Sequence, residues 1–280
     1  MFADDTSIII KSASPTEFTN ALQSNLINAD KWFKNNLLTL NTDKTHILQF
    51  CTKSDQIIDL RILYGNKQVT TVNATKFLGM TIDSTLTWKH HVDSIVPKLN
   101  KACFAIRLVI SYVTTEILKT LYFSYFHSIM TYGVIFWGNS VCSQDIFKTQ
   151  KRVIRIIYNL GARDSCRCAL KKLEILPFYS QYLYSLLMFV AKNKDLFQNN
   201  ASYHSVNTRH KNDLHLPSAR LTIFQKGVLF SGTKAYNHLP LKLKDLSQDI
   251  KRFKPALRMF FQINSFYSIE EYFKYNSTLK

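Results

Sequence analysis

Glycine is scarce in this sequence, with 7 residues in a chain of 280. A phosphate-binding loop needs several closely spaced glycines, and no Walker-type or dinucleotide-binding pattern occurs. All-β folds built on tight turns are disfavoured for the same reason, because glycine is the residue that such turns most often require. We therefore set aside P-loop enzymes, dinucleotide-binding enzymes and all-β proteins.

A regular set of cysteine pairs and long apolar runs are also lacking. The five cysteines are odd in number and irregular in spacing, and the N-terminus is too acidic and polar for a secretory signal. We therefore expect a reduced intracellular protein, in the nucleus or the cytoplasm. Of the two most apolar stretches, residues 117–137 are interrupted by polar side chains and residues 182–191 are too short to span a bilayer. We expect no membrane segment and no membrane partner.

Acidic residues are few for the number of basic ones. The chain carries 36 Lys and Arg against 19 Asp and Glu, a formal net charge of +17. Residues 1–100 hold 10 basic and 9 acidic side chains, whereas residues 101–280 hold 26 basic and 10 acidic ones. An excess confined to one part of a chain indicates a polyanionic partner, most simply nucleic acid; the alternative is a generally basic, soluble surface.

The sequence does contain enough apolar material for a core. Hydrophobic residues make up 46% of the chain and aromatic residues 13%, which argues against wholesale disorder. The patterns predict an α+β fold over residues 1–86, followed by mainly α-helical parts over residues 87–200 and 201–280. The last part is rich in basic residues and begins with polar, linker-like sequence.

In the first region, Ser14 followed by Pro15 and Glu17 predicts a helix start, and apolar residues then recur at helical spacing as far as Phe33. We expect this helix to pack its apolar face on a sheet. Apolar runs predict strands at residues 8–11, 45–50, 60–64, 68–72 and 77–82, the third and fourth of which form a hairpin around Gly65-Asn66.

In the second region, helical spacing predicts helices near residues 88–99, 115–132 and 176–192. A kink or break is expected at Pro97, because proline removes a backbone hydrogen bond. In the third region, residues 222–229 fit either a strand or a helix, and a final amphipathic helix is predicted from the spacing of Phe253, Leu257, Phe260 and Phe261.

The clearest binding signal lies in a further helix, predicted near residue 150. Four cations recur there at positions i, i+3, i+4 and i+7, and apolar residues occupy the opposite face. Such a helix can track a phosphate backbone, and the positive run continues beyond it; the alternative is an ordinary amphipathic surface helix. The candidate nucleic-acid-binding residues are Lys148, Lys151, Arg152, Arg155, Arg163, Arg167, Lys171 and Lys172.

Two adjacent carboxylates, Asp4 and Asp5, precede the apolar run Ser7-Ile8-Ile9-Ile10. This order predicts a β-hairpin with an acidic tip. Paired carboxylates suit Mg²⁺, because hard cations prefer oxygen ligands. Two aspartates near a terminus are more often solvated turn residues, so the pair gains weight only from the rest of the chain.

A series of segments, in order, resembles the reverse transcriptase of non-LTR retrotransposons, the jockey-like and related LINE elements. Residues 2–6, Phe-Ala-Asp-Asp-Thr, resemble that family's catalytic box, and residues 76–83 resemble the block that grips the primer end. The resemblance covers nearly all of the chain, and the ordered set is more specific than any single motif. The other segments are Trp32-Phe33, 37–41, Lys44-Thr45, 86–92, Tyr132-Gly133, Trp137-Gly138, 150–157, 235–240 and Phe253-Lys254.

The resemblance implies the C-terminal half of a polymerase palm over residues 1–86, a helical thumb or connection region over 87–200 and a basic C-terminal segment over 201–280. It implies RNA-directed DNA polymerase activity, a nucleotidyltransferase reaction on an RNA template and a DNA primer with dNTP. Asp4 and Asp5 are then catalytic ligands of Mg²⁺ or Mn²⁺.

The same resemblance assigns two further sites in the first region. Lys44 is expected near the triphosphate of the incoming nucleotide, as a positive group or proton donor; the alternative is an ordinary surface lysine. Phe77, Leu78 and Gly79 are expected to bring backbone close to the primer terminus, where glycine allows close approach.

The family's fingers and first catalytic Asp have no counterpart in this sequence. The resemblance therefore implies a truncated reverse transcriptase that is inactive alone. Two alternatives remain open: a non-catalytic RNA- or DNA-binding remnant that uses only the basic helices, and a degenerate reading frame whose half palm exposes a sheet edge and aggregates.

Overall fold

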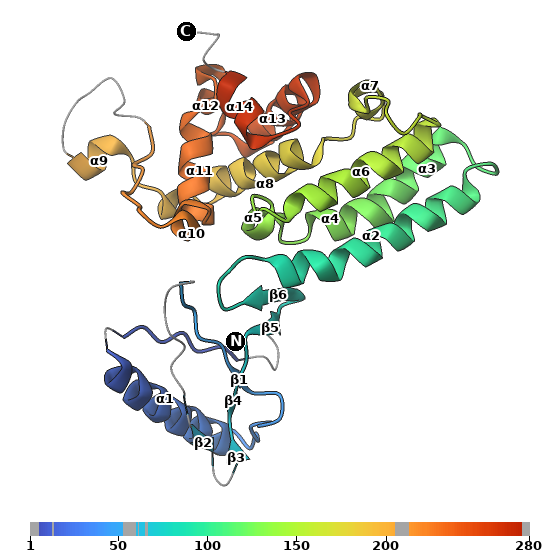
Figure 1. The fold of residues 1–280 in the computed structure, drawn as a ribbon. Helices are drawn as coiled ribbons and strands as arrows, with labels where there is room; N and C mark the ends of the chain where they lie inside the picture. The colour runs from blue at the N-terminus through green and yellow to red at the C-terminus, as the bar shows by residue number, and fades with distance from the viewer. Residues whose placement is uncertain are drawn as a thin grey trace. The chain divides into compact units, whose positions relative to one another are not determined.

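The structure, a computed structural model, describes residues 6–12, 14–52, 60, 62–64, 67–204 and 213–275. The chain divides into two compact units, Met1–Leu86 and Thr87–Lys280. Figure 1 shows short strands and one long helix in unit 1, and helices throughout unit 2. The described part is thus mainly helical with a few short strands, which confirms the predicted helical character of the region after residue 86.

Unit 1 contains one long helix, α1, Pro15–Asn35. Its start is determined locally, because Ser14 Oγ accepts a hydrogen bond from the Glu17 N–H at 3.3 Å and Pro15 lies in the first turn, where no N–H is needed. The predicted helix start is confirmed. No α1 residue is fully buried, so this helix is held by half-buried side chains.

The described part of unit 1 also contains six short strands, paired in three two-stranded sheets. β1 is parallel to β4, whereas β2 and β3, and likewise β5 and β6, are antiparallel. Buried residues in this unit include Leu60, Ile62 and Val69. The strands are β1 His46–Ile47, β2 Leu63–Tyr64, β3 Lys67–Gln68, β4 Thr70–Thr71, β5 Ala74–Phe77 and β6 Met80–Asp83.

The strand predictions have mixed outcomes. The hairpin predicted within residues 60–72 is confirmed in part: β2 pairs with β3, but Thr70 and Thr71 of the predicted second arm form β4 and pair with β1. The strand predicted at 45–50 is reduced to the two residues of β1. The strand predicted at 8–11 is wrong: residues 6–12 form no strand, and Ile9 is 92% exposed. An apolar run becomes a strand only where a partner supplies backbone hydrogen bonds, and the spacing of apolar residues does not reveal that partner.

The single strand predicted at residues 77–82 is also wrong. β5 and β6 are the arms of a hairpin, with Phe77 opposite Met80. Leu78 and Gly79 form the two-residue turn, with φ angles of 46° and 78°. Two positive φ angles match the twist of antiparallel strands, and glycine adopts such an angle without strain. The turn escapes sequence analysis because Leu78 continues the apolar run.

Unit 2 is a helical assembly. Its helices are α2 Lys89–Val109, α3 Thr115–Leu121, the π-helix η1 Tyr122–His127, α4 Ser128–Thr131, α5 Val134–Trp137, α6 Ser143–Tyr158, α7 Arg167–Lys172, α8 Phe178–Lys192, the 3₁₀ helix η2 Lys194–Leu196, α9 Asn200–His204, α10 Thr222–Gln225, α11 Val228–Asn237, α12 Leu241–Leu246, α13 Ile250–Asn264 and α14 Ile269–Tyr275. Within the described ranges, no helix has both the length and the apolar character that a bilayer crossing requires.

The core of unit 2 surrounds α8. This helix contacts α5, α6, α11, α13 and α14, so helices from the C-terminal region share one core with those before residue 200. Trp137 and Phe178 are fully buried and stack with ring centroids 5.6 Å apart. α2 packs on α4 and α6, and Figure 1 shows these three helices side by side.

Most helix predictions for unit 2 are confirmed. Residues 115–131 are helical throughout, and α6 and α8 lie where apolar spacing predicts them. Residues 222–229 belong to two helices, α10 and the start of α11. The helix predicted around Phe253 is α13, but it is not the last one, because α14 follows.

Pro97 lies inside α2 and does not end it, so the predicted break does not occur, whereas the alternative, a kink, stays a prediction. The carbonyl that loses its N–H partner belongs to Asp93, four residues earlier. Both Pro97 and Asp93 are exposed, so water can replace the lost hydrogen bond. The burial of the opposite side of α2 then keeps the helix continuous.

Candidate nucleic-acid interface

α6 carries the four cations that the sequence places on one helix face. Its apolar side faces the core, and this leaves Lys148 and Arg152 exposed and Lys151 and Arg155 half-buried on the other side. The helix ends at Asn159, which adopts a left-handed conformation and donates its N–H to the last carbonyl groups. The buried side comprises Ser143, Ile146, Phe147, Thr149, Gln150, Val153, Ile154 and Ile157.

The two arginines of α6 are held by neutral acceptors. Arg152 Nη1 donates to Asn100 Oδ1 of α2 at 3.1 Å, and Arg155 Nη2 donates to the main-chain carbonyl of Asp164 at 3.1 Å. A neutral acceptor positions a guanidinium without cancelling its charge. Both groups therefore present an oriented positive charge of the kind that binds phosphate oxygens.

The two lysines of α6 are more loosely engaged. Lys148 Nζ lies 3.0 Å from Asp145 Oδ1, and both side chains are exposed, so the pair is weak and easily exchanged for another anion. Lys151 Nζ lies 4.7 Å from the centroid of the Phe147 ring. A cation–π contact leaves the net charge in place.

The cations beyond α6 fall into two groups. Arg163, Lys171 and Lys172 are exposed, and none of them takes part in an ion pair among the described residues. They continue the run of exposed positive charge in the sequence past the end of α6. Arg167 differs from them, because it is half-buried and engaged within the protein.

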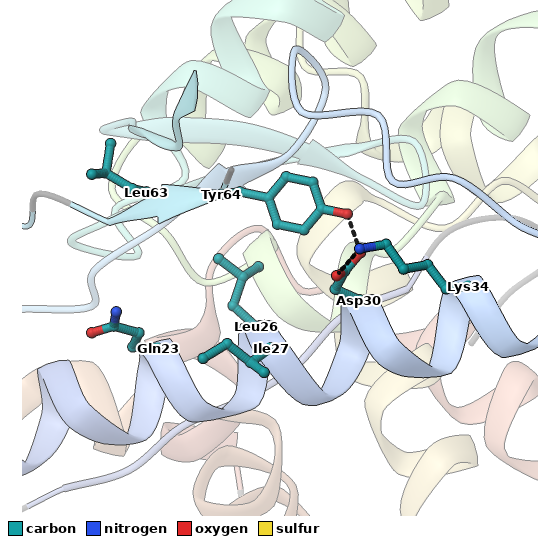
Figure 2. A pocket seen from close by; sticks show the side chains of 7 residues that line it. All are labelled: Gln23, Leu26, Ile27, Asp30, Lys34, Leu63 and Tyr64. Atoms are coloured by element: carbon teal, nitrogen blue, oxygen red, sulfur yellow. Dashed lines mark hydrogen bonds and ion pairs between the residues drawn. The ribbon is translucent and has the colours of Figure 1, made fainter. Parts of the chain in front are cut away.

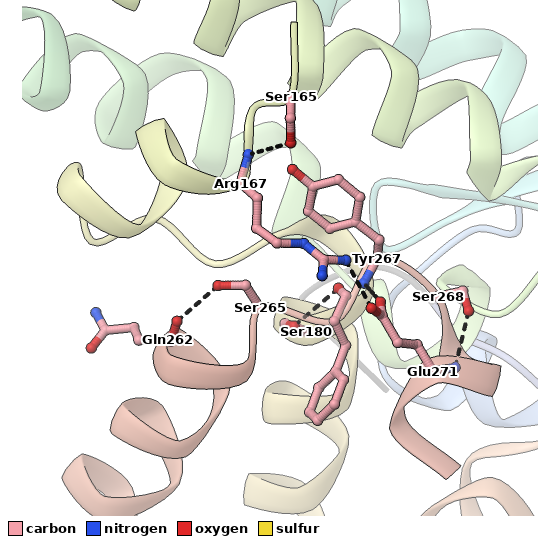
Figure 3. Close-up of polar contacts among 9 residues, drawn as sticks. Ser165, Arg167, Ser180, Gln262, Ser265, Tyr267, Ser268 and Glu271 are labelled. Carbon is pink, nitrogen blue, oxygen red and sulfur yellow. Dashed lines mark hydrogen bonds and ion pairs between the residues drawn. The ribbon is translucent and has the colours of Figure 1, made fainter. Parts of the chain in front are cut away.

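Figure 3 shows the contacts of Arg167. Its Nη2 lies 2.8 Å from Glu271 Oε1, and its guanidinium carbon lies 4.4 Å from the centroid of the Tyr267 ring. The same carboxylate accepts the Tyr267 N–H, while Ser268 Oγ accepts the Glu271 N–H at 3.1 Å. Arg167 thus joins α7 to the start of α14, and Glu271 compensates its charge.

α2 contributes residues that sequence analysis does not single out. Arg107 and Arg152 both act on the Cys103 thiol: burial raises the pKa of Cys103 to about 11, and the two positive charges oppose that rise. With the hydrogen bond from Arg152 to Asn100, this places cations of α2 and α6 along one seam. The signal in the sequence is three basic and no acidic residues between 94 and 112.

The sites expected in unit 1 are only partly described. Asp4 and Asp5 lie outside the described residues, so the metal site stays a prediction, and the described part contains no cluster of three or more potential metal ligands. Lys44 is exposed in a turn before β1. Leu78 and Gly79 form the β5–β6 turn, which presents backbone at its tip.

A separate polar cluster joins α1 to β2 (Figure 2). Asp30 accepts hydrogen bonds from the Tyr64 hydroxyl and from Lys34 Nζ, the latter at 2.8 Å. These two contacts, Lys34 foremost, lower the pKa of Asp30. The three side chains line a surface pocket of about 250 Å³ together with Gln23, Leu26, Ile27 and Leu63. The one carboxylate of this cluster, Asp30, is already paired with Lys34, so we assign the cluster a structural role.

The comparisons with known proteins identify no relative. No family model matches the chain, and no curated protein or solved structure matches it. We therefore infer function from the residues and their geometry.

Proposed function

We propose that unit 2 binds nucleic acid through the cationic side of α6. The observation that carries this proposal is the pair of arginines, Arg152 and Arg155, which are oriented by neutral acceptors and belong to no ion pair among the described residues. Lys148, Lys171 and Lys172 add exposed charge nearby in sequence. Such a surface contacts phosphate groups rather than base edges, so binding depends on backbone and shape more than on sequence.

A binding assay with a matched pair of charge reversals tests this proposal. Arg152→Glu weakens RNA binding by about tenfold or more, because a hydrogen bond to a charged group is worth ~1.5–3 kcal/mol and the new carboxylate repels phosphate. It also reduces the magnitude of the slope of log affinity against log salt by about 0.7 for a single-stranded RNA, because one phosphate fewer is neutralised. The measurement is fluorescence anisotropy of a labelled RNA over a range of salt concentrations.

Arg252→Glu is the control for this experiment. Arg252 is an exposed arginine near the start of α13, so its reversal changes the net charge by the same amount on another helix. It leaves the affinity within about twofold of the parent if binding is localised on α6. Equal losses in both variants indicate a diffuse charge effect and contradict the proposed interface.

The finer form of the proposal is that the chain is the C-terminal part of a non-LTR reverse transcriptase. Its support is the ordered set of motif segments and the position of Leu78 and Gly79 at a hairpin tip, where backbone can approach a primer end. The partners are then an RNA template and a DNA primer, and the cofactor is Mg²⁺ or Mn²⁺ at Asp4 and Asp5. A reading frame upstream of Met1 without an Asp-bearing apolar strand contradicts this form.

A further inference from the structure

An exposed apolar row runs along the C-terminal half of α2 and past its end. Phe104, Leu108 and Tyr112 recur every four residues and are 62%, 59% and 85% exposed. Residues four apart lie on one side of a helix, so Phe104 and Leu108 are neighbours on its surface. Single exposed apolar residues are ordinary, but Phe104 and Leu108 side by side, followed by Tyr112 in the turn after the helix, form a surface feature.

Cations flank this row on both sides. Lys101 precedes Phe104 by three residues and Arg107 follows it by three, and both are exposed. Lys98, one turn before Lys101, is exposed as well. The opposite side of α2 is buried in the core through residues that include Ala102, Cys103 and Ile106. The row and its cations therefore face outward together.

The row is continuous with the α6 surface. Arg152 of α6 reaches Asn100 of α2, and Arg107 acts on the same Cys103 thiol as Arg152 does. A nucleic-acid strand that is bound by α6 and continues to Phe104 would pass the positive charges of Arg152 and Arg107. No acidic residue lies between positions 94 and 112 to repel it.

We propose that the C-terminal half of α2 and the turn after it form a stacking platform for single-stranded nucleic acid, on which Phe104 and Tyr112 stack unpaired bases while Lys101 and Arg107 hold the adjoining phosphates. The proposal rests on the proposed function of α6 and names the form of nucleic acid that unit 2 prefers. Exposed aromatic rings interleaved with cations are the combination that binds single strands, because every unpaired base has a free face to stack. Bases inside a duplex are already stacked on each other and gain nothing from Phe104.

The test compares two probes of equal length, a labelled oligouridine and a blunt RNA duplex, with the full chain. Phe104→Ala weakens oligouridine binding by about five- to hundredfold, the range for loss of one base–aromatic stack. Duplex binding changes by less than about twofold. Phe104→Tyr retains single-strand affinity and Phe104→Leu does not, which separates stacking from simple apolar contact.

The control is Tyr125→Ala, which removes an exposed aromatic ring from η1 and leaves both affinities unchanged. Unchanged oligouridine binding in Phe104→Ala overturns the proposal and leaves the row as a contact surface for a protein. If Phe104→Ala weakens the binding of the oligouridine and of the duplex equally, the proposal is overturned as well. If Arg152→Glu weakens the binding of both probes while Phe104→Ala weakens the binding of neither, the α6 interface stands and only the stacking platform is rejected. If Arg152→Glu also has no effect on binding, the proposed function fails as well.

Discussion

Gln150 illustrates how a polar side chain can organise the core of unit 2. It is fully buried on α6, and its amide nitrogen donates to the Tyr122 hydroxyl and to the Leu176 carbonyl, both at 2.9 Å. Its amide oxygen accepts the Phe178 N–H at 2.8 Å. One residue thereby connects α6, η1 and the start of α8 with its hydrogen bonds satisfied, as a buried amide requires.

His127 is a buried side chain whose hydrogen-bonding groups are not all satisfied. Its Nδ1 is buried without a hydrogen-bond partner in the described part of the chain, and its ring packs against Tyr122 and Phe123. Burial, with a smaller contribution from the positive charge of Arg258, lowers the pKa of His127 to about 4. The folded state therefore favours the neutral imidazole.

We expect this histidine to make the protein sensitive to acid. The pKa of His127 in the folded state lies below its unfolded value of about 6.5. The stability that the neutral imidazole contributes is therefore fully present above about pH 6.5 and is lost as the pH falls towards 4. Between pH 7 and pH 5 the loss from His127 is about 2 kcal/mol. Urea unfolding followed by circular dichroism at these two pH values measures it.

Two variants isolate the contribution of His127. His127→Phe, which keeps a ring between Tyr122 and Phe123, reduces the loss of stability between pH 7 and pH 5 by about 2 kcal/mol. His90→Phe, at an exposed position on α2, leaves the loss as it is in the parent. Burial also lowers the pKa of His91 and of His238, so part of the acid sensitivity remains. An unreduced loss in His127→Phe contradicts the assignment.

At the scale of elements, close packing of α5 on α8 depends on one glycine. Gly138 ends α5, and a Cβ atom there would lie 2.4 Å from Tyr182 Cδ2 of α8 and 2.6 Å from the Val134 carbonyl oxygen. Tyr182 is itself fully buried, so it has no room to move. The two helices can approach this closely only because position 138 has no side chain.

Gly138→Ala is therefore expected to destabilise unit 2 by about 1–3 kcal/mol, the usual cost of overpacking a core. Gly161→Ala is the control, because its added Cβ would meet only the Asp164 side chain, at 3.0 Å, and Asp164 is exposed. We expect that variant to stay within about 0.5 kcal/mol of the parent. Equal unfolding midpoints for the two variants in urea would show that α5 can shift away from α8.

The elements also differ in how far the sequence predicts them. Apolar spacing is enough for α6 and α8, and apolar spacing with a local cap at Ser14 is enough for α1, because helix hydrogen bonds connect residues four apart in the chain. The strands predicted at 8–11 and 77–82 are wrong, because a strand depends on a partner elsewhere and on turns such as Leu78-Gly79. The helix α14 escapes prediction because it is short and begins among polar residues.

At the scale of the whole molecule, charge and core both concentrate in unit 2. The hydrophobic cluster that includes Trp137, Phe178 and Phe261 is built from residues after Thr87. The same part of the chain holds nearly all of the positive excess. The proposed nucleic-acid interface and the large hydrophobic core therefore belong to the same unit.

The reverse transcriptase proposal makes its prediction at this scale. Under this proposal the catalytic palm needs an Asp-bearing apolar strand in addition to residues 1–86, so the test uses a longer protein that includes such a strand. In that longer protein, Asp4→Ala reduces primer extension on an RNA template to background, because a ligand of the catalytic metals is removed. Asp43→Ala, at an exposed position, is the control and retains activity. Primer extension that survives Asp4→Ala contradicts the site assignment.

The sequence alone determined where the long helices α6, α8 and α13 lie, the polarity of α6 and the concentration of charge after residue 100. These properties depend on neighbours a few positions apart, which a sequence displays directly. Only the tertiary structure decided which cations keep their charge available. Arg167 is compensated by Glu271, and Arg152 is oriented by Asn100, and neither partner is near in the chain. Such pairings arise from packing between helices, so no local pattern records them.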